Sequence, residues 1–167
     1  MEELREKSTE EIIQLYSGAI KELKRREVIR TNNVVGELGE YLAITHYNNT
    51  PGLPNLSPAP VCTENIDAIS RKGDRYSIKS TSNTTTGVFY GLEPEGSSIP
   101  DKQKFEYVIL CKFDDDYELE TIFELDWDTF LKNKHWHKRM TAWNLSLTRK
   151  LREQCKVIYE RPAGQCE

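Results

Sequence analysis

Residues 65–80 constrain the fold more than any other stretch, because they read as a β-hairpin with an ionisable group in each strand. A Lys-Gly-Asp turn joins the strands, and Gly73 supplies the positive φ that a tight turn needs. Asp67 lies in the first predicted strand and Lys79 in the second, each beside apolar neighbours. A carboxylate and an ammonium on neighbouring strands can form a metal and phosphate site. The alternative is a solvated surface ion pair, which stabilises a fold by at most about 1 kcal/mol.

Three further strands are predicted after this hairpin. Residues Phe105–Phe113 are nearly all apolar at their centre, which is typical of a central strand. Three aspartates then form a turn, and Tyr117–Phe123 is the returning strand. Because the spacing and glycine of an EF-hand loop are missing, these aspartates indicate a solvated hairpin tip. Lys156–Glu160 is predicted as an edge strand.

Two helices are predicted before the hairpin. Ser8 and Glu11 have the spacing of a capping box, and apolar residues follow at helical spacing for about 18 residues. The second helix starts near Asn32 or Asn33 and carries glycines within its apolar stripe. Small residues there let a helix approach another backbone closely.

Two glutamates of the second helix, Glu37 and Glu40, lie three residues apart and therefore share a face. They are either solvated or contribute to a metal site. Their position beside glycines on an otherwise apolar helix motivates the second interpretation.

The stretch from Lys132 to Lys156 is strongly basic and contains a single acidic residue, Glu153. Basic side chains interleaved with aromatic ones suit a nucleic-acid backbone and its bases. The alternative is the solvated face of a peripheral helix whose tryptophans pack inward. The predicted nucleic-acid-binding residues are Lys132, Lys134, Trp136, Lys138, Arg139, Arg149, Lys150 and Arg152.

The composition indicates a protein of the cytoplasm. A length of 167 residues predicts one domain, and the net charge of −4 means that any nucleic-acid contact needs a local basic patch. No apolar run approaches the roughly 20 residues that span a bilayer, so no membrane partner is expected. The charged N-terminus lacks the apolar region of a signal peptide. Cys62, Cys111, Cys155 and Cys166 are far apart and read as reduced thiols, with Cys111 in the core.

In sequence order, the domain divides into four predicted parts. They are an N-terminal helix at 1–30, a core helix and sheet at 32–125, a basic helical segment with an edge strand at 126–160, and a disordered tail at 161–167.

The ordered set of a helix glutamate, a strand aspartate and a strand lysine resembles the PD-(D/E)xK nuclease superfamily. The helix motif is similar to Gly36–Ala43, with Glu40 in the place of the acid. Ile66-Asp67 stands where Pro-Asp is found in the family, and Ser77-Ile78-Lys79 where (Asp/Glu)-x-Lys is found. The resemblance implies an α/β fold of the α+β mixed-sheet kind, a restriction-endonuclease-like core with a central mixed β-sheet flanked by helices.

The resemblance also implies a Mg²⁺ or Mn²⁺ site and roles for its residues. Asp67 is the expected main ligand, together with the backbone carbonyl of Ile78. Glu40 is expected to bind through water or to position a second ion, with Glu37 as a further candidate. Lys79 is expected to orient the attacking water and to offset negative charge in the transition state.

Ser77 departs from the family pattern, which has an acid at this position. A neutral serine is a poor Mg²⁺ ligand, so three explanations are open. Another residue, with Glu37 or Glu40 nearest, supplies the acid; a single metal ion suffices; or the chain keeps the fold without catalysis.

Three functions of different classes follow from these patterns. The leading hypothesis is a Mg²⁺-dependent DNA endonuclease that acts as a homodimer, because two active sites are needed to cut both strands. The second is a catalytically degenerate module that binds nucleic acid on the same fold. The third is a protein-interaction domain, which the negative net charge keeps open.

Overall fold

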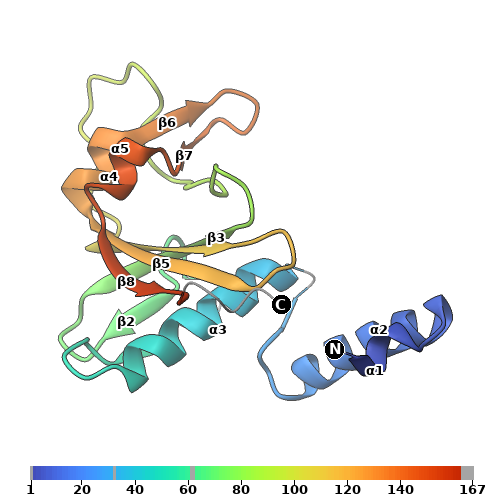
Figure 1. The fold of residues 1–167 in the computed structure, drawn as a ribbon. Coiled ribbons are helices and arrows are strands. Elements are labelled where there is room, and N and C mark those ends of the chain that lie inside the picture. The colour runs from blue at the N-terminus through green and yellow to red at the C-terminus, as the bar shows by residue number, and fades with distance from the viewer. Residues whose placement is uncertain (1, 32, 61–62, 163–167) are drawn as a thin grey trace.

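In a computed structural model, which describes residues 2–31, 33–60 and 63–162, the chain forms a mixed α/β fold around one large sheet (Figure 1). The six strands of this sheet lie in the order β1-β2-β3-β4-β5-β8, with β3 and β4 parallel and the other neighbours antiparallel. The predicted central mixed sheet flanked by helices is therefore confirmed. The elements are α1 Glu2–Arg5, α2 Thr9–Arg25, α3 Val34–Asn49, β1 Leu56–Pro58, β2 Ala68–Ser70, β3 Arg75–Thr81, β4 Tyr107–Phe113, β5 Leu119–Asp126, α4 Trp127–Asn133, β6 Lys134–His137, β7 Ala142–Leu145, α5 Arg149–Arg152 and β8 Lys156–Glu160.

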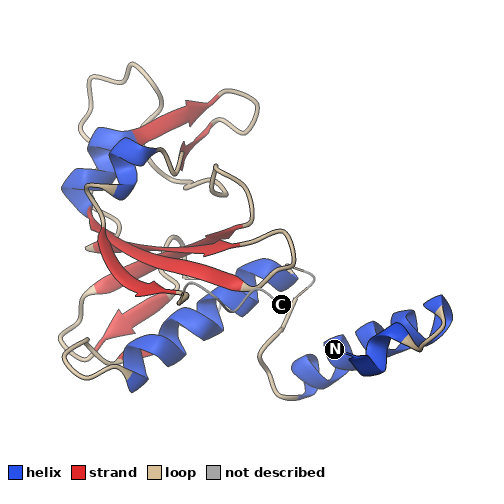
Figure 2. Cartoon of the chain, in the orientation of Figure 1, coloured by secondary structure: helices blue, strands red, loops and turns tan. Residues whose placement is uncertain are grey.

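The central strand β4 explains how the sheet is covered on both faces. Successive side chains of a strand point to opposite faces. Val108 and Leu110 pack in one buried cluster with α4, β7 and α5. Ile109 and Cys111 pack in a second cluster with α3. Figure 2 shows the corresponding helices on the two sides of the strands, and this double burial is why the β4 sequence is a continuous apolar run.

The hairpin predicted at residues 65–80 is present as β2 and β3. The strands pair antiparallel with Ala68 opposite Tyr76, and Gly73 has a φ of 91° in the turn. Asp67 lies immediately before β2 and not within it. Its backbone N–H nevertheless donates to the Tyr76 carbonyl at 2.8 Å, so the side chain is held at the point where pairing begins.

The two predicted helices begin at their expected caps. Ser8 and Glu11 form the reciprocal capping box of α2, which spans 17 residues. The Asn33 side chain accepts from the Gly36 N–H at 3.3 Å and caps α3. The alternative cap, Asn32, lies outside the described residues.

The prediction of a helical segment over 126–160 is correct for α4 and wrong for residues 134–145, which form the β6–β7 hairpin. Trp136 and Trp143 face each other across this hairpin with ring centroids 5.2 Å apart, and such cross-strand aromatic pairs stabilise a hairpin. The helical pattern returns only in the short α5. β8 is the predicted edge strand.

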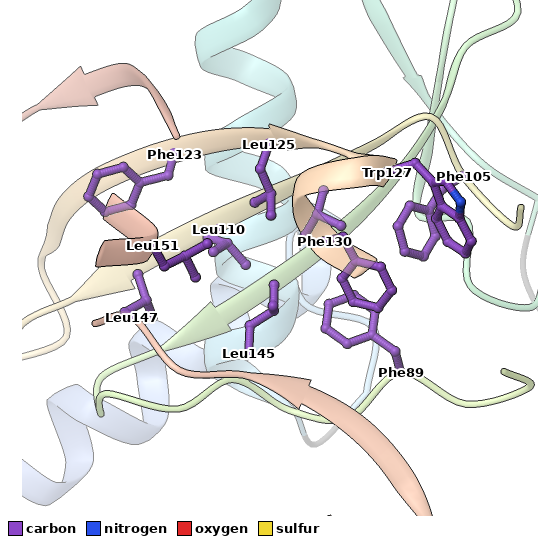
Figure 3. Packing of buried hydrophobic residues seen from close by; sticks show 11 residues of the cluster. Phe89, Phe105, Leu110, Phe123, Leu125, Trp127, Phe130, Leu145, Leu147 and Leu151 are labelled. Atoms are coloured by element: carbon purple, nitrogen blue, oxygen red, sulfur yellow. The ribbon is translucent and has the colours of Figure 1, made fainter. Parts of the chain in front are cut away.

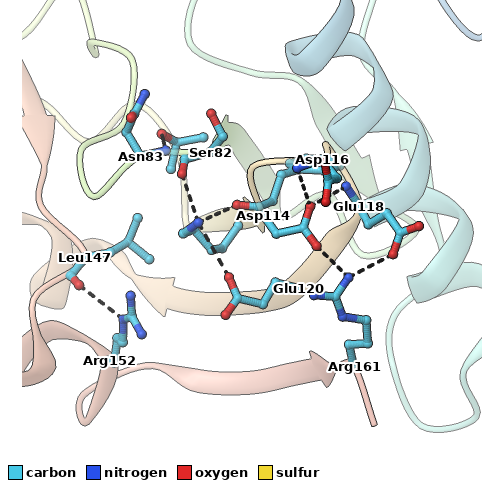
Figure 4. Close-up of polar contacts among 12 residues, drawn as sticks. Ser82, Asn83, Asp114, Asp116, Glu118, Glu120, Leu147, Arg152 and Arg161 are labelled. Carbon is cyan, nitrogen blue, oxygen red and sulfur yellow. Dashed lines mark hydrogen bonds and ion pairs between the residues drawn. The ribbon is translucent and has the colours of Figure 1, made fainter. Parts of the chain in front are cut away.

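The predicted disordered tail is wrong at its first residue. The Arg161 guanidinium contacts Asp114 at 2.7 Å and Glu118 at 3.0 Å, and it thereby ties the chain after β8 to the β4–β5 turn (Figure 4). Residues 163–167 lie outside the described part of the chain.

Gly39 lets α3 approach β3 closely, and replacing it with alanine is expected to destabilise the fold by about 1–3 kcal/mol. A Cβ at this position would lie 1.8 Å from Ser80 Oγ and 2.9 Å from Ser80 Cβ, so the helix must move away from the strand. Urea unfolding measures the change. Gly18→Ala in α2 is the matched control, because a Cβ there meets no atom within 4 Å and alanine favours the helix. Equal stability of Gly39→Ala and Gly18→Ala would contradict the close approach.

Candidate active site

Three consecutive residues of β3 converge on one carboxylate oxygen of Asp67. The Ile78 N–H donates to Asp67 Oδ2 at 2.6 Å, and Ser77 Oγ donates to the same oxygen at 3.3 Å. Lys79 Nζ lies 3.8 Å from it. The structure therefore brings together Asp67, Ser77, Ile78 and Lys79, and it leaves Asp67 Oδ1 without a hydrogen bond from the described residues.

The strand lengths explain this convergence. β3 continues past Tyr76, whereas its neighbour β2 begins at Ala68, opposite Tyr76. At Ile78 the neighbouring strand is absent, so the Ile78 N–H donates to the Asp67 carboxylate in place of a strand carbonyl. Because the N–H and C=O of a strand residue point to the same edge, the Ile78 carbonyl points toward Asp67 as well.

The two helix glutamates have different surroundings. Burial alone would raise the pKa of Glu37, but hydrogen bonds from Thr31 and the Arg30 backbone outweigh it, and the pKa is lowered. Burial raises the pKa of Glu40, and the negative charge of Asp67 raises it further, with partial compensation from Arg30 and Lys79. The charge of Asp67 thus acts on the pKa of Glu40. Glu37 instead accepts a hydrogen bond from the Arg30 backbone and so holds the segment before α3 in place.

A cleft of about 460 Å³ lies beside these carboxylates. Its lining includes Arg30, Glu37, Glu40, Pro60, Ile66 and Asp67. Arg30 was not anticipated from the sequence. Its Nη2 lies 3.4 Å from Glu40 Oε2 and its Nε lies 3.9 Å from Glu37 Oε2, so a cation lines the cleft, while Lys79 contacts Asp67 at its edge. The sequence signal, a lone arginine shortly before a helix, is too common to single it out.

The metal-binding capacity of the site rests on few protein ligands. Among the residues that the structure describes, no group of three or more His, Cys, Asp or Glu side chains is placed to hold a metal ion. The available donors are the carboxylates of Asp67 and Glu40 and the Ile78 carbonyl. This all-oxygen set fits Mg²⁺, which takes one or two carboxylates and keeps several waters. The raised pKa of Glu40 beside Asp67 also reflects a repulsion that a bound cation relieves.

The predicted basic surface is divided by the fold. Lys134 is turned inward, where it pairs with Asp101 and lies 3.9 Å from the centre of the Trp143 ring. Arg149 pairs with Glu153 at 2.8 Å, and Arg152 Nε donates to the Leu147 carbonyl (Figure 4). The positions left exposed without an ion pair in the described chain are Lys132, Lys138, Arg139 and Lys150.

The hairpin that carries Lys138 and Arg139 is connected to the candidate site through Phe89. The Phe89 backbone pairs with Trp143 of β7, and Trp136 stacks edge-on against Trp143. Lys79 Nζ lies 5.3 Å from the centre of the Phe89 ring. Trp136 is consequently a half-buried packing residue of the hairpin and not an exposed base-stacking platform.

The cysteines that the structure describes lie outside this site. Burial raises the pKa of the Cys111 thiol to about 12, and Cys111 is a core residue as predicted. Cys155 is half-buried, and Cys62 and Cys166 fall outside the described residues. Within the described ranges no helix combines the length and apolar character needed to cross a membrane.

No protein-family model matches this chain, and no curated protein matches it. The geometry around Asp67 is therefore the main support for any assignment of function.

Replacing Glu40 with glutamine is expected to raise the free energy of unfolding at pH 8. The pKa of Glu40 is raised in the folded chain, so below about pH 4 the carboxyl is neutral in both states and the substitution changes little. As the pH rises through the folded pKa, the wild-type carboxyl ionises against its burial and against Asp67, and only the wild type loses stability. Urea unfolding of both proteins at pH 4 and pH 8 measures the difference.

Glu95→Gln is the control for this experiment, because Glu95 is exposed in a loop and has no ion pair in the described chain. The prediction is contradicted if Glu40→Gln is less stable than the wild type at pH 8, or if the two proteins have equal stability at both pH values. Either result would show that the fold does not disfavour the ionised form of Glu40.

Proposed function

We propose that this protein is a Mg²⁺-dependent endonuclease that hydrolyses phosphodiester bonds of DNA, with a site of the PD-(D/E)xK kind. The observation that carries the proposal is the convergence of Ile78 N–H and Lys79 Nζ on Asp67, at the edge of a cleft that also holds Glu40 and Arg30. Oxygen donors beside two cations suit a phosphate with a divalent cation. A cleft carboxylate such as Glu40, whose pKa is raised by burial and by a neighbouring carboxylate, is typical of functional sites.

Each side chain has a role in this proposal. Asp67 and Glu40, with the Ile78 carbonyl, would hold Mg²⁺. When bound there, the ion supplies a lowered water pKa and a positive charge that stabilises the developing negative charge on phosphorus. Lys79 orients the attacking water by hydrogen bonding. Arg30 offers a planar set of hydrogen-bond donors for a phosphate oxygen. Its side chain is 49% exposed even though it contacts Glu40, so donors remain accessible to a ligand.

Ser77 takes a supporting role in the same proposal. Its side chain is 0% exposed and donates to Asp67, so it faces the carboxylate and not open solvent. We assign the role of the missing second acid of the family pattern to Glu40 of α3, whose pKa is raised by the charge of Asp67.

The proposed DNA contacts are the exposed cations Lys132, Lys138, Arg139 and Lys150, and the proposed enzyme is a homodimer that acts in the cytoplasm. Lys138 and Arg139 lie at the turn of a hairpin joined to Lys79 through Phe89. We propose that a DNA backbone bound at the cleft also contacts this turn. Because such contacts release counterions from DNA, the affinity is expected to fall as the salt concentration rises.

Incubation of the purified chain with supercoiled plasmid tests the proposal. With Mg²⁺ or Mn²⁺, nicked and then linear DNA is expected, and EDTA is expected to stop the reaction. A folded chain that leaves plasmid DNA and short DNA duplexes intact with both metals would overturn the proposed catalysis.

A second candidate, a nucleic-acid-binding module without catalysis, is favoured by one observation. Ser77 stands in place of an acid, and the described residues contain no group of three metal-ligating side chains. This candidate gives a salt-sensitive gel shift with DNA and no cleavage with any divalent metal. Absence of both binding and cleavage at low salt would instead favour a protein-interaction domain.

A further inference from the structure

Helix α2 lies apart from the sheet and from α3 (Figure 1). None of its 17 residues is buried. Ile12 is 37% exposed and Tyr16 is 67% exposed, and Ile13 and Leu15 beside them are exposed as well. Such a run of large apolar side chains on one isolated helix is unusual for a surface that only water covers.

The apolar residues of α2 share one side of the helix. At about 100° per residue, Ile12, Tyr16, Ala19 and Leu23 fall on one stripe, and the charged residues fall mainly opposite. An isolated helix of this length is marginal in water, and most helices in proteins are stabilised by packing of their apolar face. The capping box at Ser8 supports the start of α2 but does not cover the stripe.

We propose that the stripe of α2 is an interface between two copies of this chain, which pack their α2 helices antiparallel. A two-fold axis between Ser17 and Gly18 places Ile12 against Leu23 of the second copy. It also places Tyr16 against Ala19, so that a large side chain meets a small one. Helices packed in this way interlock their side chains along a narrow apolar seam.

The charges of α2 select this direction of pairing. The first turn of the helix is acidic and the last turn is basic, so antiparallel packing sets opposite charges side by side and parallel packing sets like charges together. Glu11 is held by the capping box, and Arg25 and Arg26 are held by Glu22. Glu10 and Lys24, in contrast, have no ion pair within the described chain.

Glu10 and Lys24 lie outside the stripe, about 160° and about 120° from Ile12 around the helix. In a two-fold antiparallel pair with its axis between Ser17 and Gly18, Glu10 of each copy lies at nearly the same height along the helix as Lys24 of the other. The acidic first turn of each copy therefore attracts the basic last turn of the other across the pair, without direct contact between these two side chains.

Sedimentation equilibrium of the full chain over a concentration series tests the interface. The wild type is expected to be a dimer, and Ile12→Glu and Tyr16→Glu are each expected to raise the dimer dissociation constant by at least about 30-fold. Ile99→Glu is the matched control, because Ile99 is exposed in a loop away from α2, and it is expected to leave the dimer unchanged. Far-UV circular dichroism checks that each variant keeps its helices.

Exchange of the two charges tests the direction of packing. Glu10→Lys and Lys24→Glu are each expected to weaken the dimer, because each sets like charges together. The double variant restores opposite charges at both ends of the pair and is expected to recover most of the affinity.

Three results would overturn this proposal. They are a wild type that stays monomeric, which would leave the stripe to another partner; a dimer that tolerates Ile12→Glu and Tyr16→Glu; and a double charge exchange that dimerises no better than the single variants. None of these results depends on DNA cleavage, so the proposed nuclease activity stands or fails separately.

Discussion

Replacing Asp67 with asparagine is expected to reduce Mg²⁺-dependent plasmid cleavage by at least about 100-fold. Asparagine keeps an oxygen that accepts the Ile78 N–H, so the hairpin and the cleft are retained. It removes the negative charge that the proposed metal site needs and that Lys79 faces at 3.8 Å. The loss should therefore appear in the rate of cleavage and not in the stability of the fold. Initial rates of plasmid nicking measure it.

Two further variants make this experiment decisive. Asp115→Asn removes an exposed carboxylate from the β4–β5 turn and is expected to cleave like the wild type. Lys79→Ala is expected to lower the rate strongly while leaving Asp67 held by Ile78 and Ser77. Cleavage that persists unchanged in both Asp67→Asn and Lys79→Ala would place the catalytic site elsewhere, even if the chain is a nuclease.

Replacing Phe130 with alanine is expected to lower the free energy of unfolding by about 3–5 kcal/mol. Phe130 is 0% exposed and lies at the centre of an aromatic group (Figure 3). Its ring centroid lies 4.8 Å from that of Phe89, 5.2 Å from that of Phe105 and 5.5 Å from that of Trp127. Removal of the ring takes away this packing and leaves a cavity that rigid neighbours fill only in part.

Chemical denaturation measures the effect, with Tyr90→Ala as the control. Tyr90 is 49% exposed, and its replacement is expected to change stability by less than about 0.5 kcal/mol. Phe130 packs against Phe89, and the Phe89 ring lies 5.3 Å from Lys79 Nζ, so this core cluster also supports the position of Lys79 in the candidate site. A loss as small as that of Tyr90→Ala would mean that this cluster is loosely packed.

Much of the fold was predictable from local signals. The turn glycine Gly73, the capping box at Ser8 and the cap at Asn33 each act within a few residues of their own position. The continuous apolar run of β4 identified a strand covered on both faces. These predictions were correct because backbone conformation and burial pattern are properties of short stretches of chain.

The hairpin at residues 134–145 was not predictable in the same way. Basic residues with interleaved tryptophans suit either an amphipathic helix or a hairpin, since both put the aromatic side chains on one side. The choice depends on contacts with distant parts of the chain. Phe89 pairs with Trp143, and Asp101 draws Lys134 inward. As a result, Lys134 of the basic run is bound in an ion pair, whereas Lys138 and Arg139 remain exposed.

The candidate site divides along the same line. The proximity of Asp67 and Lys79 was predicted from the sequence, because the two arms of one hairpin lie close together. The helix glutamates were proposed from their shared helix face and from the resemblance to the nuclease superfamily. Only the tertiary structure distinguished Glu40 from Glu37 and added Arg30 to the cleft. That choice depends on how α3 packs on β3 through Gly39, a contact between segments about 40 residues apart that no local pattern encodes.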